Sequence, residues 1–233
     1  MKAIGSLKYA GSVFRNIPTI KVSQDLFDDL GGNGLDERVA VAVEIAAKPA
    51  NYSPGAPIIH RPFDEVEWMA AVTYPFEHIC SSRLSTGKEY GVWYGSQQLE
   101  TTVHETLHYQ INRLIADFAR PGFTPSQVDR SVYQLDLSRL LVDMTKPAKE
   151  AERFSDPASH AYAQMKAAEL RDAGAVGLLY RSARCHGNNV GLFFPDGLSN
   201  PRVLCYLSYH FDGEATRIMR GHSDITSEVM ASA

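Results

Sequence analysis

The hydrophobic pattern is clearest in the middle of the chain. From Leu99 to Phe118 the apolar residues recur mostly three or four positions apart, which predicts a helix that buries one face and is ended by Pro121 and Gly122. Just upstream, the aromatic segment 90–94 is typical of a strand that ends at Gly95. The two patterns together predict a strand that leads into a long helix.

The second half of the chain alternates the same two patterns. Residues 131–137 alternate as a strand does, and Asp156 followed by Pro157 is typical of a helix start. That helix is expected to run to about Ala173, where Gly174 ends it. Three short apolar runs are then predicted as strands: 175–180, 189–194 and 203–209. Short strands interleaved with helices predict an α+β fold.

The first part of the chain is less regular. A short helix at 26–29 before a turn at 31–34, a loop at 48–62 with several prolines, and a helical turn or two at 64–72 are expected there. The apolar run 39–47 fits either a strand or a helix. The last twenty or so residues are polar and are expected to be peripheral.

Composition supports a soluble globular protein. The 233 residues are 44% hydrophobic and carry a formal net charge of −4, which excludes a disordered chain and offers no basic surplus for direct nucleic-acid binding. Three cysteines without framework spacing predict a reducing compartment. No apolar run is long enough for a membrane helix, and the N-terminus does not resemble a signal peptide. We therefore expect a single cytoplasmic domain with no membrane contact.

One motif points to metal chemistry. His104, Glu105 and His108 follow the His-Glu-x-x-His pattern, in which two histidines one helical turn apart bind zinc and the glutamate is a general base. No third ligand is evident at a suitable distance. A helical wheel turns Glu105 away from the apolar stripe of Val103 and Leu107, toward solvent or a cleft. A zinc hydrolase is kept as the alternative function.

Two longer segments resemble the RES-domain family, the toxins of RES–Xre toxin–antitoxin pairs. Residues 82–106 read SRLSTGKEYGVWYGSQQLETTVHET and residues 178–193 read LLYRSARCHGNNVGLF. Arg83, Tyr94 and Glu105 match the family's arginine, tyrosine and glutamate, and Ser182 matches its later serine. Residues 13–18 and 212–213 resemble the outer edges of the longer members. The resemblance therefore covers about residues 14–213 of a single domain, with 1–13 and 214–233 peripheral.

The resemblance implies a fold similar to that of ADP-ribosyltransferases, a mixed or split β-sheet with flanking helices. It also implies a toxin that cleaves the nicotinamide–ribose bond of NAD⁺, as an NAD⁺ glycohydrolase or, with phosphate as acceptor, an NAD⁺ phosphorylase. NAD⁺ is then a substrate, with no cofactor and no metal. The implied partner is an Xre-type helix-turn-helix antitoxin that covers the active site, with a homodimer inside that complex. His104 departs from the small or apolar residues usual before the glutamate.

The residue types fit this chemistry. Positive charge develops on the ribose as nicotinamide leaves, and the carboxylate of Glu105 is a candidate to stabilise it. Arg83 offers a charged fork for a phosphate, Tyr94 a ring and a hydroxyl for nicotinamide or ribose, and Ser182 a hydroxyl for the diphosphate. The structural alternatives are a solvated glutamate, a surface salt bridge, a core tyrosine and a serine that caps its own turn.

Two further arginines are weaker candidates for substrate binding. Arg15 lies in the outer segment that resembles the family, and Arg184 flanks the serine. The sequence leaves open whether water or phosphate is the acceptor, whether NADP or a protein is modified instead, and the oligomeric state. A binding module that keeps the fold without activity is the third alternative.

Overall fold

The computed structural model describes residues 5–19, 69–118, 126–146, 148–211 and 215–231. These residues form one mixed sheet of eight strands in the order β1-β2-β5-β4-β3-β6-β7-β8, with a further pairing between β1 and β3. The strands are β1 (Gly5–Pro18), β2 (Trp93–Ser96), β3 (Ser126–Asp143), β4 (Gly177–Arg181), β5 (Asn188–Leu192), β6 (Leu198–Phe211), β7 (Thr216–Arg220) and β8 (Ser223–Asp224). The helical elements are η2 (Met69–Thr73), α4 (Tyr74–Glu77), α5 (Leu99–Phe118), α6 (Ala148–Phe154), α7 (Ala161–Asp172) and α8 (Thr226–Met230). The predicted α+β class is confirmed.

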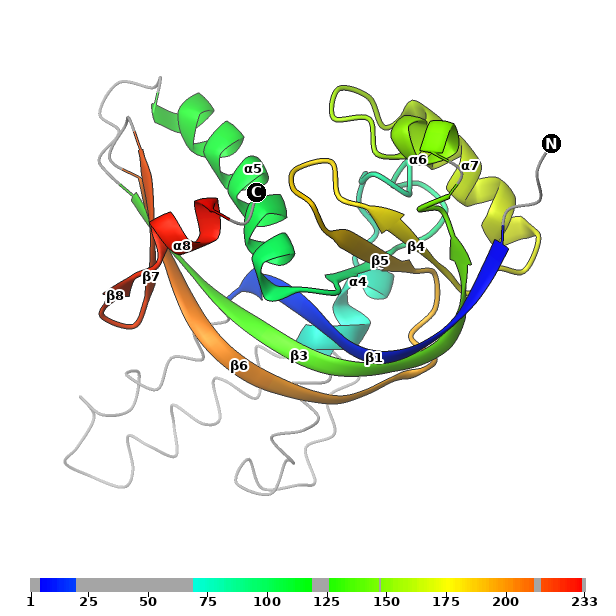
Figure 1. Cartoon of the computed structure of the whole chain (residues 1–233), viewed down its shortest axis with the longest axis horizontal. Helices are drawn as coiled ribbons and strands as arrows, with labels where there is room; N and C mark the ends of the chain where they lie inside the picture. The colour runs from blue at the N-terminus through cyan, green and yellow to red at the C-terminus, as the bar shows by residue number, and fades with distance from the viewer. Residues whose placement is uncertain (1–4, 20–68, 119–125, 147, 212–214, 232–233) are drawn as a thin grey trace, which may run out of the picture.

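Part of the sheet closes on itself. β1 pairs antiparallel with β3 over its whole length, and its other edge meets β2 where Phe14 lies opposite Ser96. β2 pairs with β5, β5 with β4, and β4 runs parallel to β3 at Val142 and Asp143. α5 and the α6–α7 pair lie on either side of β4 and β5 (Figure 1). The closure brings β2, β4, β5 and the end of β1 together.

Both ends of the described chain contribute individual side chains to the core. In β1, Tyr9 and Val13 are buried, and near the C-terminus Ile218 and Val229 are buried. These four side chains come from the segments 1–13 and 214–233 that the sequence predicts to be peripheral, so each segment contributes individual residues to the core while most of its described residues are exposed or half-buried. Small and polar residues interrupt the hydrophobic pattern of both segments, and Leu7 and Met230 are exposed, so the sequence pattern does not reveal the buried positions.

The long helix α5 is confirmed: it begins at Leu99, as the apolar spacing predicts, and it is helical up to Phe118, where the described range ends. Val103 and Leu107 pack against Leu207 and Tyr209 of β6 and against Val229 of α8. This packing fixes the rotation of α5 about its axis. Burial of these apolar residues therefore also sets the direction in which the other face of α5 points.

The second predicted helix begins later than expected. α7 starts at Ala161, because the Asp156 carboxylate accepts the N–H of Ala158 in a local turn and does not cap a helix. A separate helix, α6, precedes it and was not predicted. At the other end Gly174 has a φ of 90°, the left-handed conformation that its place after a helix requires.

The remaining predictions are largely confirmed where they fall on described residues. β4, β5 and β6 contain most of the predicted runs, β3 extends the predicted strand in both directions, and β2 begins at Trp93 instead of at 90. Of the segment 64–72, only 69–72 is described, as part of η2. The predictions for 26–29, 31–34, 39–47 and 48–62, and the stop at 121–122, lie outside the described residues.

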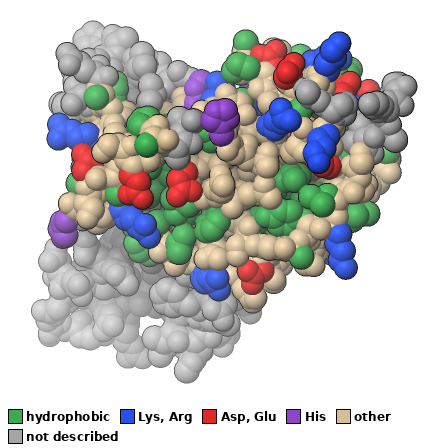
Figure 2. Space-filling view, viewed as in Figure 1, with side chains coloured by type: hydrophobic (Ala, Val, Ile, Leu, Met, Phe, Trp, Pro, Cys, Tyr) green, Lys and Arg blue, Asp and Glu red, His purple; other side chains and the backbone are tan. Residues whose placement is uncertain are grey.

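The surface shows no segregation of charge on the face seen in Figure 2. Basic and acidic side chains are interspersed there around a central zone that is mostly uncharged. None of the helices in the described ranges is long and apolar enough to cross a membrane.

Candidate active site

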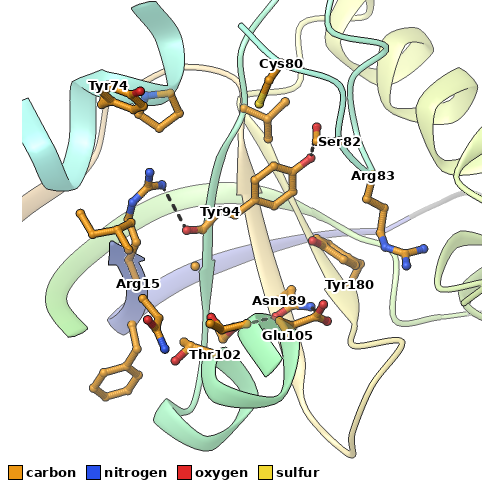
Figure 3. Close-up of a pocket in the computed structure, with 18 of the residues that line it drawn as sticks. Arg15, Tyr74, Cys80, Ser82, Arg83, Tyr94, Thr102, Glu105, Tyr180 and Asn189 are labelled. Carbon is orange, nitrogen blue, oxygen red and sulfur yellow. Dashed lines mark hydrogen bonds between the residues drawn. The ribbon is translucent and has the colours of Figure 1, made fainter. Parts of the chain in front are cut away.

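The candidate site is a cavity of about 390 Å³ at the place where the closed part of the sheet meets α5. Arg83, Tyr94 and Glu105 all line it, together with Arg15 from β1 and Asn189 from β5 (Figure 3). The three matching residues, which follow one another at intervals of eleven residues, therefore line one cavity together with residues from distant parts of the chain.

Residues of β2 line this cavity. Trp93 is fully buried in the core, so the alternation of the strand turns Tyr94 to the cavity. The next position requires glycine, because a Cβ on Gly95 would lie 2.4 Å from the Trp93 ring and 3.0 Å from the carbonyl oxygen of Phe14. The missing side chain lets the indole and β1 approach closely, and this sets the position of Tyr94.

The Glu105 carboxylate is held by two neutral donors. The Ser182 hydroxyl donates to Oε1 over 2.6 Å, and the Asn189 side-chain amide donates to the same oxygen over 2.6 Å. Asn189 Oδ1 in turn accepts from the Ser96 hydroxyl at 2.6 Å. The carboxylate is thus fixed at the cavity wall without being neutralised by a cation.

Ser182 lies at the start of the β4–β5 loop, which folds onto α5. Its N–H donates to the Gly187 carbonyl over 2.7 Å, and its Oγ accepts the N–H of Arg184 at 3.0 Å. Gly187 sits so close to the helix that a Cβ would lie 2.0 Å from Thr101 Oγ1. The tight loop brings Ser182 to Glu105, although Ser182 itself does not line the cavity.

The Tyr94 hydroxyl is engaged by the chain itself. It accepts the N–H of Leu84 at 2.9 Å and shares a hydrogen bond of 2.7 Å with the Ser82 hydroxyl. The ring is therefore fixed between β2 and the segment that carries Arg83 (Figure 3). The ring face, more than the hydroxyl, is what this arrangement offers to a ligand.

Two arginines near the cavity face no carboxylate in the described part of the chain. Arg83 Nη1 donates to the carbonyls of Phe154 and Asp156 over 3.3 and 2.9 Å. Arg15 Nη1 donates to the Tyr94 carbonyl at 3.3 Å, its guanidinium lies 5.4 Å from the centre of the Trp93 ring, and its buried Nε has no partner. Positive charge therefore remains for an anionic ligand.

Arg15 is desolvated as well. Burial, followed by the charge of nearby Arg130, lowers the pKa of Arg15 to about 9, which leaves the guanidinium charged at neutral pH. The other weak candidate, Arg184, donates from Nη2 to the Pro157 carbonyl at 3.3 Å, and its Nε is buried without a partner. Arg15 lines the cavity and Arg184 lies beside the Ser182 loop.

The His-Glu-x-x-His motif is divided between two environments. The buried His104 ring contacts α8, where Nε2 lies 3.0 Å from the Val229 carbonyl, whereas Glu105 faces the cavity. Within the described ranges no group of three or more His, Cys, Asp or Glu side chains could hold a metal ion. Among the described residues, His104 is therefore engaged in packing against α8, while Glu105 of the same motif lines the cavity.

Two histidines lie near Glu105 with lowered pKa values. Burial, followed by the positive charge of Arg184, lowers the pKa of His108, and burial, followed by Arg83, lowers the pKa of His160. The Glu105 charge acts in the opposite direction on both. Both pKa values therefore lie below 6.5, and both rings are mainly neutral at pH 7.

These histidines predict a loss of stability on acidification. Because their folded pKa values are below 6.5, the unfolded chain takes up protons first as the pH falls through about 6.5, and the folded state is destabilised. We expect Tm to fall between about pH 7 and pH 5, and the double variant His108→Gln/His160→Gln to show a smaller fall. Differential scanning fluorimetry across this range checks it; equal slopes in the two proteins would contradict it.

The sequence did not identify Asn189 and Ser96. Both are small polar residues in strands, and nothing in their local pattern separates them from solvent-facing positions. The only signal is that Ser96 and Asn189 lie opposite each other in the β2–β5 pair. That register exists only in the folded sheet.

A family model described as the RES domain matches residues 58–212, which is more than half of the chain and includes Arg83, Tyr94, Glu105 and Ser182. One solved structure with weak similarity is the MbcT–MbcA toxin–antitoxin complex of M. tuberculosis, at 10% sequence identity and a TM-score of 0.45, over 90% of this chain and 88% of that chain. No curated protein matches significantly.

Proposed function

The chain belongs to the RES-domain family, and from this premise we propose that it is a toxin that cleaves the nicotinamide–ribose bond of NAD⁺. The observation that supports this most directly is Glu105, a carboxylate held by Ser182 and Asn189 at the wall of a cavity. A fixed negative charge at a cavity wall is the group that an oxocarbenium-like transition state requires.

The proposed reaction breaks the bond between the ribose anomeric carbon and the nicotinamide nitrogen. The bonding electrons leave with nicotinamide, which departs as a neutral molecule, and the ribose becomes positively charged. Glu105 stabilises that charge, and water or phosphate then attacks the same carbon. Water gives ADP-ribose and releases a proton, whereas phosphate gives ADP-ribose-1″-phosphate. Both acceptors fit a site with this charge.

The two arginines support a substrate with several phosphate oxygens. Arg15 and Arg83 both line the cavity and face no carboxylate among the described residues. A diphosphate or an acceptor phosphate supplies the anion that a buried guanidinium otherwise lacks. We assign Arg83, Tyr94, Glu105 and Ser182 as the main site residues, with Arg15 and Arg184 as further contacts to phosphate.

An aromatic pair at the cavity rim supports a substrate with a second base. The Tyr74 and His78 rings are stacked at 4.0 Å between centroids and 12° between planes, and Tyr74 is 54% exposed. Both residues line the cavity. A flat ring held at the rim is suited to stacking on adenine.

Tyr74→Ala is expected to raise the KM for NAD⁺ by about tenfold, since stacking of a base on an aromatic ring contributes roughly 1–3 kcal/mol. Inhibition by AMP should weaken equally, and product inhibition by nicotinamide should not change. Tyr74→Phe keeps the ring and is the matched control. Steady-state kinetics measure these values. An unchanged KM in Tyr74→Ala would contradict the stacking of adenine on Tyr74.

The proposed partner is an antitoxin of the Xre type that covers the cavity. Any contact with DNA is then made by the partner, and a homodimer of this chain within the complex is part of the proposal. The toxin acts on the NAD⁺ of the cytoplasm, so expression without the antitoxin should deplete NAD⁺ and stop growth. The partner's effect on purified enzyme is measured directly as loss of NAD⁺ cleavage.

The decisive experiment incubates the purified protein with NAD⁺, with and without phosphate, and identifies the products by mass spectrometry. ADP-ribose would indicate hydrolysis, and ADP-ribose-1″-phosphate would indicate phosphorolysis. NADP⁺ and a protein acceptor are run in parallel. Intact NAD⁺ in every sample would overturn the proposed function.

A further inference from the structure

We propose that Asn189, oriented by Ser96, is a positioning residue that fixes the Glu105 carboxylate so that its Oε2 oxygen faces the reacting ribose. The inference rests on the proposed function for the identity of the substrate. It adds two residues to the site, Asn189 and Ser96, and it changes the role of Ser182.

The direction of the hydrogen bonds follows from Glu105. An ionised carboxylate only accepts, so Asn189 must present its NH₂ group to Oε1 at 2.6 Å. Its Oδ1 then points to the other side, where Ser96 donates at 2.6 Å. Both Asn189 and Ser96 are buried, 4% and 3% exposed, so solvent is not positioned to replace either bond. Ser96 thus keeps Asn189 in the orientation that Glu105 needs.

Ser182 completes the arrangement from the β4–β5 loop, which leads into the strand of Asn189. A serine hydroxyl has one proton, and in Ser182 this proton is donated to Glu105 Oε1 at 2.6 Å. The oxygen also accepts the N–H of Arg184. While these bonds hold, Ser182 has no proton for a substrate phosphate. Its role is therefore to orient Glu105 together with Asn189.

The two donors converge on one oxygen. Both bonds end at Oε1, and no residue in the described ranges donates to Oε2. Ser182 directly follows β4, and Asn189 lies in β5, the antiparallel neighbour of β4, so two adjacent arms of the same pair hold one carboxylate oxygen. A carboxylate held in this way meets the developing charge without reorienting.

The test uses Ser96→Ala and Asn189→Ala in the full chain. Loss of orientation should lower kcat for NAD⁺ cleavage by about 10- to 100-fold, because a displacement of about 1 Å has effects of this size, with the KM changed less than about twofold. Asn188→Ala is the matched control, since Asn188 is the next residue on β5 and its amide donates to Gln97 instead, at 2.9 Å. Its kcat should equal that of the wild type.

A double-mutant cycle separates positioning from a general structural role. If Asn189 acts through Glu105, Asn189→Ala should have no further effect on kcat when Glu105 is already Ala. Multiplicative losses in the double variant would overturn the inference. A rise in KM with unchanged kcat in either single variant would also overturn it. Circular dichroism checks that each variant is folded. If Asn189→Ala does not fold, the milder variant Ser96→Ala carries the test.

A second readout does not depend on activity. The side-chain NH₂ resonances of Asn189 should shift in both Glu105→Ala and Ser96→Ala, and those of Asn188 should not. Unshifted Asn189 resonances would overturn the inference even in an active enzyme. A wild-type protein that leaves NAD⁺ intact but shows these shifts would instead overturn the proposed function and keep the positioning network.

Discussion

Glu105→Gln is expected to slow NAD⁺ cleavage by about 10²- to 10³-fold, the usual effect of removing one electrostatic group from a transition state. Glutamine has nearly the same shape, and its amide oxygen can still accept from Ser182 and Asn189. The variant therefore removes the charge and keeps the packing. The loss should appear in kcat, with the KM little changed, because the positive ribose exists only in the transition state.

A paired variant separates this prediction from metal chemistry. His104→Ala removes the ring that contacts the Val229 carbonyl, so it should lower stability while the folded enzyme keeps its kcat. A zinc hydrolase would lose activity in both variants and in the presence of a chelator. Stopped assays of NAD⁺ at matched folded concentrations measure this. Full activity in Glu105→Gln would contradict the proposed role of the Glu105 carboxylate in stabilising the positive charge on the ribose.

The second large effect is expected at the Trp93 side chain. Trp93 is fully buried, and its indole N–H donates to the Ala71 carbonyl at 2.7 Å. Trp93→Ala should lower the free energy of unfolding by about 3–5 kcal/mol, because it leaves a cavity in the core. Arg15, which lies over this ring, would also lose its packing surface at the candidate site.

Urea unfolding followed by circular dichroism measures this effect. Tyr206→Ala is the control, since Tyr206 is an aromatic residue in β6 that is 60% exposed, and a change within about 0.5 kcal/mol is expected. Trp93→Phe keeps a ring and removes the donor to Ala71, so an intermediate loss of about 1–3 kcal/mol is expected. A Trp93→Ala protein as stable as Tyr206→Ala would contradict the assigned packing.

Local patterns determined the elements that bury one clear face. The spacing of apolar residues from Leu99 onward predicted α5 and its first residue, and short apolar runs predicted β4, β5 and β6. The start of α7 was misplaced because Asp156 and Pro157 form a turn that is locally indistinguishable from a helix start. β1 was not predicted because its buried positions are separated by small and polar residues.

The residues of the candidate site also fall into two groups, those found from the sequence and those found only in the folded structure. Arg83, Tyr94, Glu105 and Ser182 were selected from their chemistry and from the resemblance to the family, and the helical wheel already turned Glu105 away from the apolar stripe. Ser96 and Asn189 were not selected, because their significance depends on a strand register between residues far apart in the sequence. The division of His104 from Glu105 likewise depends on α8, which packs against α5.

The sequence by itself determined the chemical groups, the α+β class and the face of α5 that carries Glu105, since these depend on residue type and on helical or strand periodicity. Only the tertiary structure decided which groups meet. The pairing of β1 with β3 and of β2 with β5 closes the sheet, and this closure brings Arg15, Tyr94 and Asn189 to one cavity. Such contacts are set by the packing of the whole core, because no local stretch of chain contains both partners.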